Sequence, residues 1–485
     1  MHTTPAPPPS STADLDSPRR LSGQMTTTQL VLSVLAFSSP LVCLSGYFAL
    51  TIMSTGQTAP VAFIIVTAVL MVFSVGYMAM TRHMPRPGAF YAYISEGLGR
   101  HLGLASAFLA TLSYTVILMG VYCFGGLTIS GLISTWAGPS IPWWLTALGV
   151  WVIVAFLGYF NVEVSAKVLM WVMFVEVTTM MVFNVAVFDH GGQDGLSAAP
   201  FDVFAFASGE KLWVGMLFAM LVFIGFEATA LYRDEVRDPD RTIPRATYIA
   251  VLFIGVLYTV TVWIMVIAFG ADAEKVATED TAGMFGIAAS RYVGSTFRDV
   301  ATALVITAVL ASLLSIHNAA TRYTFNLAAD AALPRLLARV HDRHNSPYAA
   351  SLGISALSLL GVIPFVLTNN DPAVTYAQLA GLGNAGVFIL MALVSVAVVV
   401  FFRRHPTTTP HNTWATMVAP SIAAIAMTSL VAFALANFDL VVGASSANTL
   451  LLAVLATSFS AGLVVAAVMK ARRPAAFLKL GGVGR

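Results

Sequence analysis

Long apolar stretches separated by short polar segments dominate this chain from residue 29 to residue 470. A helix needs about 20 predominantly apolar residues to cross the hydrocarbon core of a bilayer. We expect twelve stretches to form membrane-spanning helices. They cover residues 29–56, 60–81, 103–131, 143–160, 166–188, 211–232, 246–270, 298–328, 349–367, 379–402, 413–436 and 446–470. The pattern therefore predicts an all-α polytopic membrane protein.

Two polar connections are longer than the rest, residues 82–100 and residues 271–297. In a chain that crosses the membrane at every span, these two connections lie on opposite sides, and each is long enough to hold a short interfacial helix. Such a displacement is typical of two inverted repeats of five helices each. We expect residues 29–188 and 211–402 to form these repeats, with residues 413–470 as two additional helices.

The composition agrees with a chain that is surrounded largely by lipid. Charged residues make up 10% of the chain and hydrophobic residues 58%, and the mean hydropathy is +0.82. Soluble domains carry about a quarter of their residues as charged types. A net charge of +2 gives no reason to expect a nucleic-acid partner. The two cysteines, Cys43 and Cys123, fall inside apolar stretches and predict no disulfide framework.

The basic residues predict the orientation. If the N-terminus is cytoplasmic, 21 of the 25 lysines and arginines fall on cytoplasmic segments or helix ends, in line with the positive-inside rule. The four exceptions are Lys211, Lys275, Arg291 and Arg298. We expect a multi-pass protein of the plasma (inner) membrane with both termini in the cytoplasm. Residues 1–28 and 471–485 would then be cytoplasmic tails, the first uncleaved and disordered.

The first span contains a proline and two hydroxyl groups near its middle. Proline removes one helical hydrogen bond, and freed backbone groups at membrane depth are tolerated only inside protein or beside a wet cavity. The span therefore either breaks around a binding site or carries a simple proline kink. The residues expected at such a break are Ser38, Ser39, Pro40, Leu41, Ser45 and Gly46.

The sixth span holds a glycine and a carboxylate at the corresponding place in the second half. Paired interruptions at matching positions favour a substrate site, because half-helix ends present free N–H and C=O groups to a ligand. The carboxylate of Glu227 could face a substrate ammonium, accept from unwound N–H groups or anchor the span to a neighbour. The residues expected at this second break are Phe223, Ile224, Gly225, Phe226 and Glu227.

Three blocks of residues resemble the amino acid–polyamine–organocation (APC) transporters. They are residues 87–93 (PGAFYAY) after span two, the segment from Gly225 through residues 241–246 (RTIPRA), and residues 315–322 (SIHNAATR) in span eight. The similarity extends from about residue 29 to residue 400. It implies a LeuT-type fold with broken helices 1 and 6, and a secondary transporter that rocks one helix bundle against the other around a midplane site.

The resemblance also implies which side chains meet the substrate and the coupling ion. It places Tyr114 and Tyr122 of span three on a wall of the substrate cavity. Many family members carry a glycine cluster at the first break, whereas Ser38-Ser39-Pro40 is closer to the polyamine importers. The expected substrate is therefore an amino acid, with a putrescine-like polyamine as the alternative.

Glu176 occupies span five about eleven residues after Ser165, where proton-coupled family members carry a lysine. A carboxylate at that depth must be protonated, paired or bound to a cation, so Glu176 could carry H⁺, hold Na⁺ or make a structural hydrogen bond between helices. In span eight, Ser312, Ser315 and His317 could line the cavity and share the coupling role, although His317 could equally be a packing residue.

The sequence contains no motif for chemistry on a substrate. It lacks a phosphate-binding Gly-x-x-x-x-Gly-Lys-Ser/Thr loop, a metal-ligand cluster and a nucleophile constellation, so we expect neither an enzyme nor a cofactor. A substrate-sensing membrane protein is the alternative from another functional class. We expect the partners to be an amino acid or amine, H⁺ or Na⁺, and the lipid bilayer.

Overall fold

The computed structural model describes residues 24–84, 89–136, 138–160, 166–209, 211–341, 344, 346–405, 412–443, 447–478 and 480. Within these ranges the chain is helical apart from connections and one isolated bridge between Met25 and Val236. Residues 1–23 of the first predicted tail, and residues 479 and 481–485 of the second, lie outside the described residues. The described part confirms the all-α prediction.

Eleven segments in the described part are long and apolar enough to cross a membrane, and a shorter apolar helix, α7 (Trp143–Tyr159), lies between the third and fourth of them. Each predicted span has a counterpart among them. The eleven are Thr27–Ser45, Tyr47–Thr81, Arg100–Ser134, Met170–His190, Leu212–Tyr232, Pro239–Glu279, Ser295–Ala329, Tyr348–Leu367, Pro372–Arg404, Trp414–Ala436 and Asn448–Arg472. The chain is therefore a multi-pass membrane protein.

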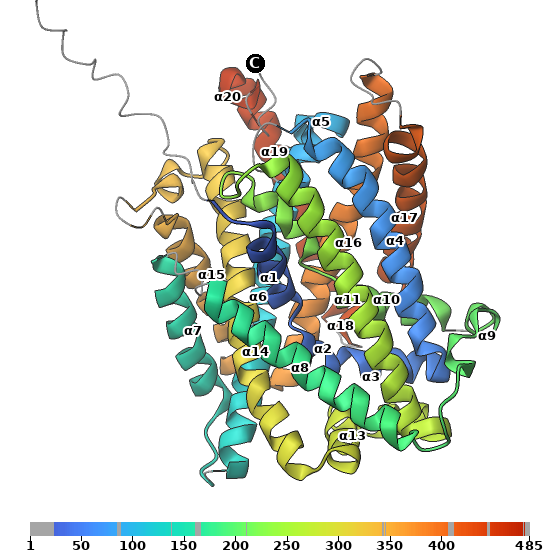
Figure 1. Ribbon diagram of the computed structural model, residues 1–485. Helices are drawn as coiled ribbons and strands as arrows, with labels where there is room; N and C mark the ends of the chain where they lie inside the picture. Colours follow the sequence, from blue (N-terminus) through green and yellow to red (C-terminus); the bar gives the residue numbers. More distant parts are fainter. Residues whose placement is uncertain are drawn as a thin grey trace, which may run out of the picture.

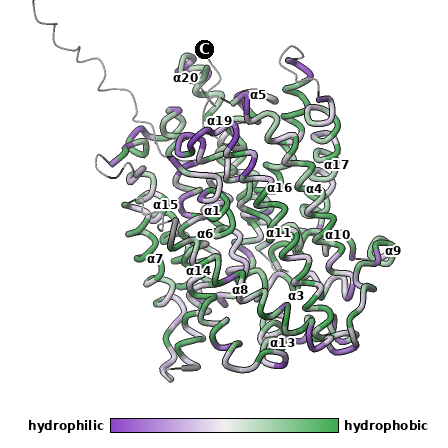
Figure 2. Tube along the Cα trace, viewed as in Figure 1, coloured by the Kyte–Doolittle hydropathy of each residue, from purple (hydrophilic) through white to green (hydrophobic). Residues whose placement is uncertain are grey.

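The two long polar connections lie at opposite ends of the helix bundle (Figure 1). The first contains α5 (Ala89–Leu98), and the second contains α12 (Ala273–Glu279) and α13 (Met284–Tyr292). Helix α1 starts at the same end as α5 and α20 (Pro474–Leu478). Hydrophilic residues gather at both ends of the bundle, and hydrophobic residues fill the zone between them (Figure 2). The inverted repeat and the cytoplasmic side of the termini remain predictions.

The first span changes direction at Ser39. Helix α1 (Thr27–Ser38) ends where Ser39 adopts a left-handed conformation, with φ of 50°. Pro40 then starts a short helix, α2 (Pro40–Ser45), at a first helical position where a missing N–H costs nothing. After Gly46 the chain continues as α3 (Tyr47–Thr55). The span is interrupted at the position that the sequence indicated.

The sixth span is interrupted in the same way. Helix α10 (Leu212–Leu221) ends, Gly225 has φ of 115°, and the chain continues as a 3-10 helix, η4 (Phe226–Tyr232). Glycine reaches this conformation without a steric penalty because it lacks a Cβ atom. Both interruptions lie inside the bundle, where α1 packs against α8 (Ala166–His190), α11 (Pro239–Phe269) and α14 (Ser295–Ala329).

Candidate functional site

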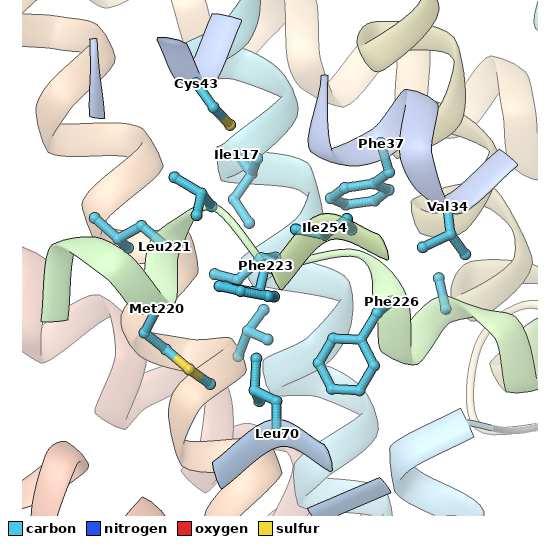
Figure 3. Close-up of a cluster of buried hydrophobic side chains, with 14 of the residues drawn as sticks. Val34, Phe37, Cys43, Leu70, Ile117, Met220, Leu221, Phe223, Phe226 and Ile254 are labelled. Atoms are coloured by element: carbon cyan, nitrogen blue, oxygen red, sulfur yellow. The ribbon is translucent and has the colours of Figure 1, made fainter. Parts of the chain in front are cut away.

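The two interruptions are bonded to one another. Ser38 Oγ donates to the carbonyl oxygen of Val222 at 2.7 Å, and it accepts from Tyr258 Oη at 2.7 Å. Val222 is the residue that follows α10, so its carbonyl has no N–H of a following helical turn to accept from. Figure 3 shows Phe223 between Leu221 on one side and Phe37 and Phe226 on the other. A side chain at the first interruption thus satisfies a backbone carbonyl at the second.

A cavity of about 60 Å³ lies against these interruptions. Its walls come from the first and sixth spans, from α14, from α6 (Arg100–Trp136) and from α16 (Pro372–Arg404). The lining residues are Phe37, Ser38, Ser39, Val42, Cys43, Tyr47, Ile117, Val121, Phe124, Leu221, Ile224, Ser312, Ile316, Tyr376, Ala380 and Asn384. Ligand pockets usually measure 300–1,000 Å³, so the cavity must widen before it can hold a metabolite.

Four of the predicted site residues line this cavity: Ser38, Ser39, Ile224 and Ser312. Ser39 is the most informative of them, because its side chain is buried and its hydroxyl has no hydrogen-bond partner. Buried hydroxyl groups are almost always bonded. Ser312 differs, because its hydroxyl donates to the Phe37 carbonyl at 3.1 Å and so stabilises the end of α1.

The other predicted residues lie around the cavity rather than on its surface. The first break is formed by Pro40, Leu41, Ser45 and Gly46. The second is formed by Phe223, Gly225, Phe226 and Glu227. Tyr122 faces a separate apolar cavity of about 230 Å³ between α6, α7 and α15 (Tyr348–Leu367). Ser315 donates to Ala311 of its own helix.

Glu227 joins the second break to α6. Its Oε1 accepts from Tyr114 Oη at 2.5 Å, and its Oε2 accepts from the Gly225 N–H at 2.9 Å. The residue is fully buried, and the Tyr114 ring stacks on Tyr323 of α14. Among the three roles considered for Glu227, these contacts favour stabilising the break and anchoring it to a neighbouring helix.

Glu176 contacts the first break from α8. Its Oε2 accepts from the Leu41 N–H at 3.3 Å, whereas its buried Oε1 has no partner. The side chain is 1% exposed and is not part of the cavity lining. A movement of α2 therefore alters the only hydrogen bond that this carboxylate makes within the described structure. This arrangement suits a group that responds to the conformation of the break.

His317 faces away from the cavity. Its Nε2 hydrogen-bonds Ser351 of α15 at 2.9 Å, and its ring leaves no room for a Cβ at Gly158 of α7. These contacts agree with the packing alternative for His317. No group of three or more His, Cys, Asp or Glu side chains that could hold a metal ion occurs in the described part of the chain.

A buried ion pair lies at the end of the bundle at which α1 begins. The Arg322 guanidinium binds Glu235 through Nε–Oε1 and Nη2–Oε2 contacts of 2.7 Å, and it stacks on the Tyr232 ring at 4.2 Å. Beside this pair, the Met25 N–H donates to the Glu235 carbonyl at 2.9 Å. The pair is almost fully buried, with side-chain exposures of 4% for Arg322 and 9% for Glu235. It ties α14 to the segment after the sixth span.

Sequence reasoning missed most of the cavity wall, although a signal was present. Ile117, Val121 and Phe124 follow Tyr114 at intervals of three, seven and ten residues, which places all four on one face of α6. Asn384 is a polar residue within the apolar helix α16, where an amide is unusual unless it has a function. Tyr47 and Tyr376 share a hydrogen bond of 2.7 Å across the cavity.

We expect Gly225→Ala to disrupt the site. The φ of 115° alone would cost a side-chain-bearing residue about 1–3 kcal/mol, and an added Cβ would lie 2.4 Å from the Phe37 ring. Purified variant protein should unfold at a lower temperature and bind substrate weakly in a thermal-shift assay. Gly149→Ala is the control, because its Cβ would meet nothing within 4 Å. Equal behaviour of the two variants would contradict this interpretation of the break.

Comparison with known proteins identifies the family. The model of the amino acid permease family matches residues 28–460. Similar relatives include the branched-chain amino acid permease BcaP of Bacillus subtilis, 24% identical over 75% of this chain and 78% of the relative. The low-affinity putrescine importer PlaP of Escherichia coli is 22% identical over 80% and 83%. The aspartate-proton symporter of Bacillus subtilis is 24% identical over 64% and 61%. This chain belongs to the amino acid permease family of APC transporters.

Proposed function

We propose that this protein is a secondary transporter that moves an amino acid across the plasma membrane by alternating access. The observation that carries the proposal is the cavity between the two interrupted spans, with Ser38 bonded directly to the second break. A site bounded by two broken helices can be exposed to one side or the other when the helix bundles rock. The family match and the transporters among the relatives support the same function.

The proposal includes coupling of transport to an ion gradient through Glu176. A carboxylate with one oxygen bonded to the first break and the other unpartnered can take up a proton or a cation when the break moves. One relative is named as a proton symporter, which favours H⁺. Glu227 would act as a positioning residue, because both its oxygens are bonded to the protein.

A polyamine importer is the second candidate. It is favoured by the Ser38-Ser39-Pro40 break and by the similarity to the putrescine importer. Uptake by the purified protein in liposomes separates the two candidates, with a panel of amino acids and putrescine under imposed proton or sodium gradients. We expect proton-driven uptake of an amino acid. If no amino acid moves under either gradient while putrescine does, the second candidate replaces the first.

A further inference from the structure

Building on the proposed function, we infer that the substrate is a zwitterionic amino acid with an uncharged aliphatic side chain. Its polar groups would bind Ser39 and Asn384, and its side chain would lie against Ile117, Val121 and Ile224. Three properties of the cavity support this assignment: no charged side chain among its described lining residues, a serine and an asparagine for which the described structure shows no side-chain hydrogen bond, and a group of branched aliphatic side chains.

No Asp, Glu, Lys, Arg or His side chain is among the lining residues that the structure describes. The two nearby carboxylates are not among these lining residues: both oxygens of Glu227 bond protein groups, and Glu176, whose Oε1 has no partner, contacts the first break from outside the cavity. A substrate with a net charge would therefore enter a buried site without an oppositely charged partner, at a large cost in binding free energy. A zwitterion carries its own compensating charge, so the cavity selects against diamines and against acidic or basic amino acids.

Two polar side chains in the cavity are available for a ligand. Ser39 Oγ is buried without a partner, and Asn384, which is 6% exposed, lines the same cavity and makes no side-chain hydrogen bond within the described residues. A hydroxyl and an amide can each donate to a carboxylate and accept from an ammonium. The neighbouring Ser38 is not available in this way, because Val222 and Tyr258 already satisfy it. The two groups come from different helices and converge on one cavity.

Much of the remaining wall is aliphatic, beside the aromatic rings of Phe37, Tyr47, Phe124 and Tyr376. Ile117 and Val121 of α6 meet Leu221 and Ile224 of the sixth span and Ile316 of α14. Such a surface gains binding free energy when it buries a methyl or isobutyl group. Because the cavity is contracted to about 60 Å³, a small side chain requires the least widening. Valine, leucine and alanine therefore fit this site better than aromatic amino acids.

A competition panel on the wild-type protein in liposomes tests the substrate class. We expect valine, leucine and alanine to compete for uptake, and lysine, aspartate and putrescine to compete at least about 100-fold more weakly. If lysine, aspartate or putrescine competes within about 10-fold of valine, the inferred class is wrong while the proposed transport stands. If no compound moves under any gradient, both the inference and the proposed function are wrong.

Asn384→Asp tests the cavity directly by adding one carboxylate with almost no change in volume. We expect valine to bind at least about 10-fold more weakly, and lysine or putrescine to gain at least about 10-fold, because the cationic group then has a partner. The matched control is Asn369→Asp, at an exposed asparagine outside the cavity. An unchanged preference in the folded Asn384→Asp protein would overturn the assignment of Asn384.

Val121→Ala provides a second test, in which we expect the fold and the polar groups of the cavity to be unchanged. The change removes two methyl groups from the aliphatic wall, so we expect the preference to move from valine towards leucine or phenylalanine by about 10-fold. Val256→Ala is the control, because Val256 is 56% exposed on the outside of α11. The same preference in both variants would show that Val121 does not contact the substrate side chain.

Discussion

Glu176→Gln is expected to abolish gradient-driven accumulation of substrate while leaving substrate binding and the fold intact. The glutamine has almost the same volume, and its amide oxygen can still accept from the Leu41 N–H that now binds Glu176 Oε2. Glutamine cannot take up a proton or carry a negative charge. The ion gradient can therefore no longer act on the first break through this side chain. Uptake should fall to the level reached without a gradient, a loss of at least about 10-fold.

The measurement compares two assays on the same liposomes. Uptake driven by an imposed proton gradient should be lost, whereas exchange of labelled for unlabelled substrate without a gradient should persist. Glu279→Gln serves as the control, since Glu279 is exposed at the end of α12. Full accumulation by Glu176→Gln would exclude this residue as the coupling group. Loss of both accumulation and exchange would instead indicate a structural role.

Breaking the buried pair between Glu235 and Arg322 should have the largest effect on stability. Glu235→Gln leaves the Arg322 guanidinium buried, with only an uncharged amide in place of its carboxylate partner. Removing one partner of a buried pair typically costs about 3–5 kcal/mol. Because the pair ties α14 to the segment beside Met25, its loss should also loosen this end of the bundle and expose the cavity there more often.

Thermal unfolding of purified protein measures the first effect. Alkylation of a cysteine introduced at Ser39, in protein whose native Cys43 and Cys123 are replaced by serine, measures the second. The double variant Glu235→Met, Arg322→Leu should be less destabilised than the sum of its single changes, because no buried charge is left unpaired. The control is Asp299→Asn, which removes a half-exposed ion pair with Arg298 worth under about 1 kcal/mol. If Glu235→Gln is no less stable than this control, the pair does not hold the bundle closed.

The spans and both interruptions could be predicted from the sequence because their causes are local. Apolar stretches of sufficient length must become helices in a bilayer, and Pro40 and Gly225 mark the places where a helix cannot continue unchanged. These signals need no knowledge of neighbouring helices. The two long connections could also be predicted to lie at opposite ends of the bundle, because the order of the spans along the chain sets the side of each connection.

The cavity wall could not be predicted to the same extent, because it depends on how each helix is rotated and packed. Tyr114 and Tyr122 both lie on α6, yet Tyr114 reaches Glu227 while Tyr122 faces another cavity. Asn384 and Tyr376 come from a helix to which the sequence assigned no role in the site. The partners of Glu227 and Glu176 lie on other helices or on unwound backbone, and no local pattern specifies such contacts.

Counterflow of labelled valine tests the central claim, that the cavity between the two breaks is the site of a carrier. Liposomes preloaded with unlabelled valine should transiently concentrate labelled valine above its equilibrium level without any ion gradient, and Ile117→Trp, which fills the cavity, should abolish this overshoot. Ile249→Trp, at a residue 50% exposed on α11, should retain it. If the wild-type protein shows no overshoot with valine or with any other compound of the competition panel, or if the overshoot is undiminished in Ile117→Trp, the cavity between the two breaks is not the site of a carrier.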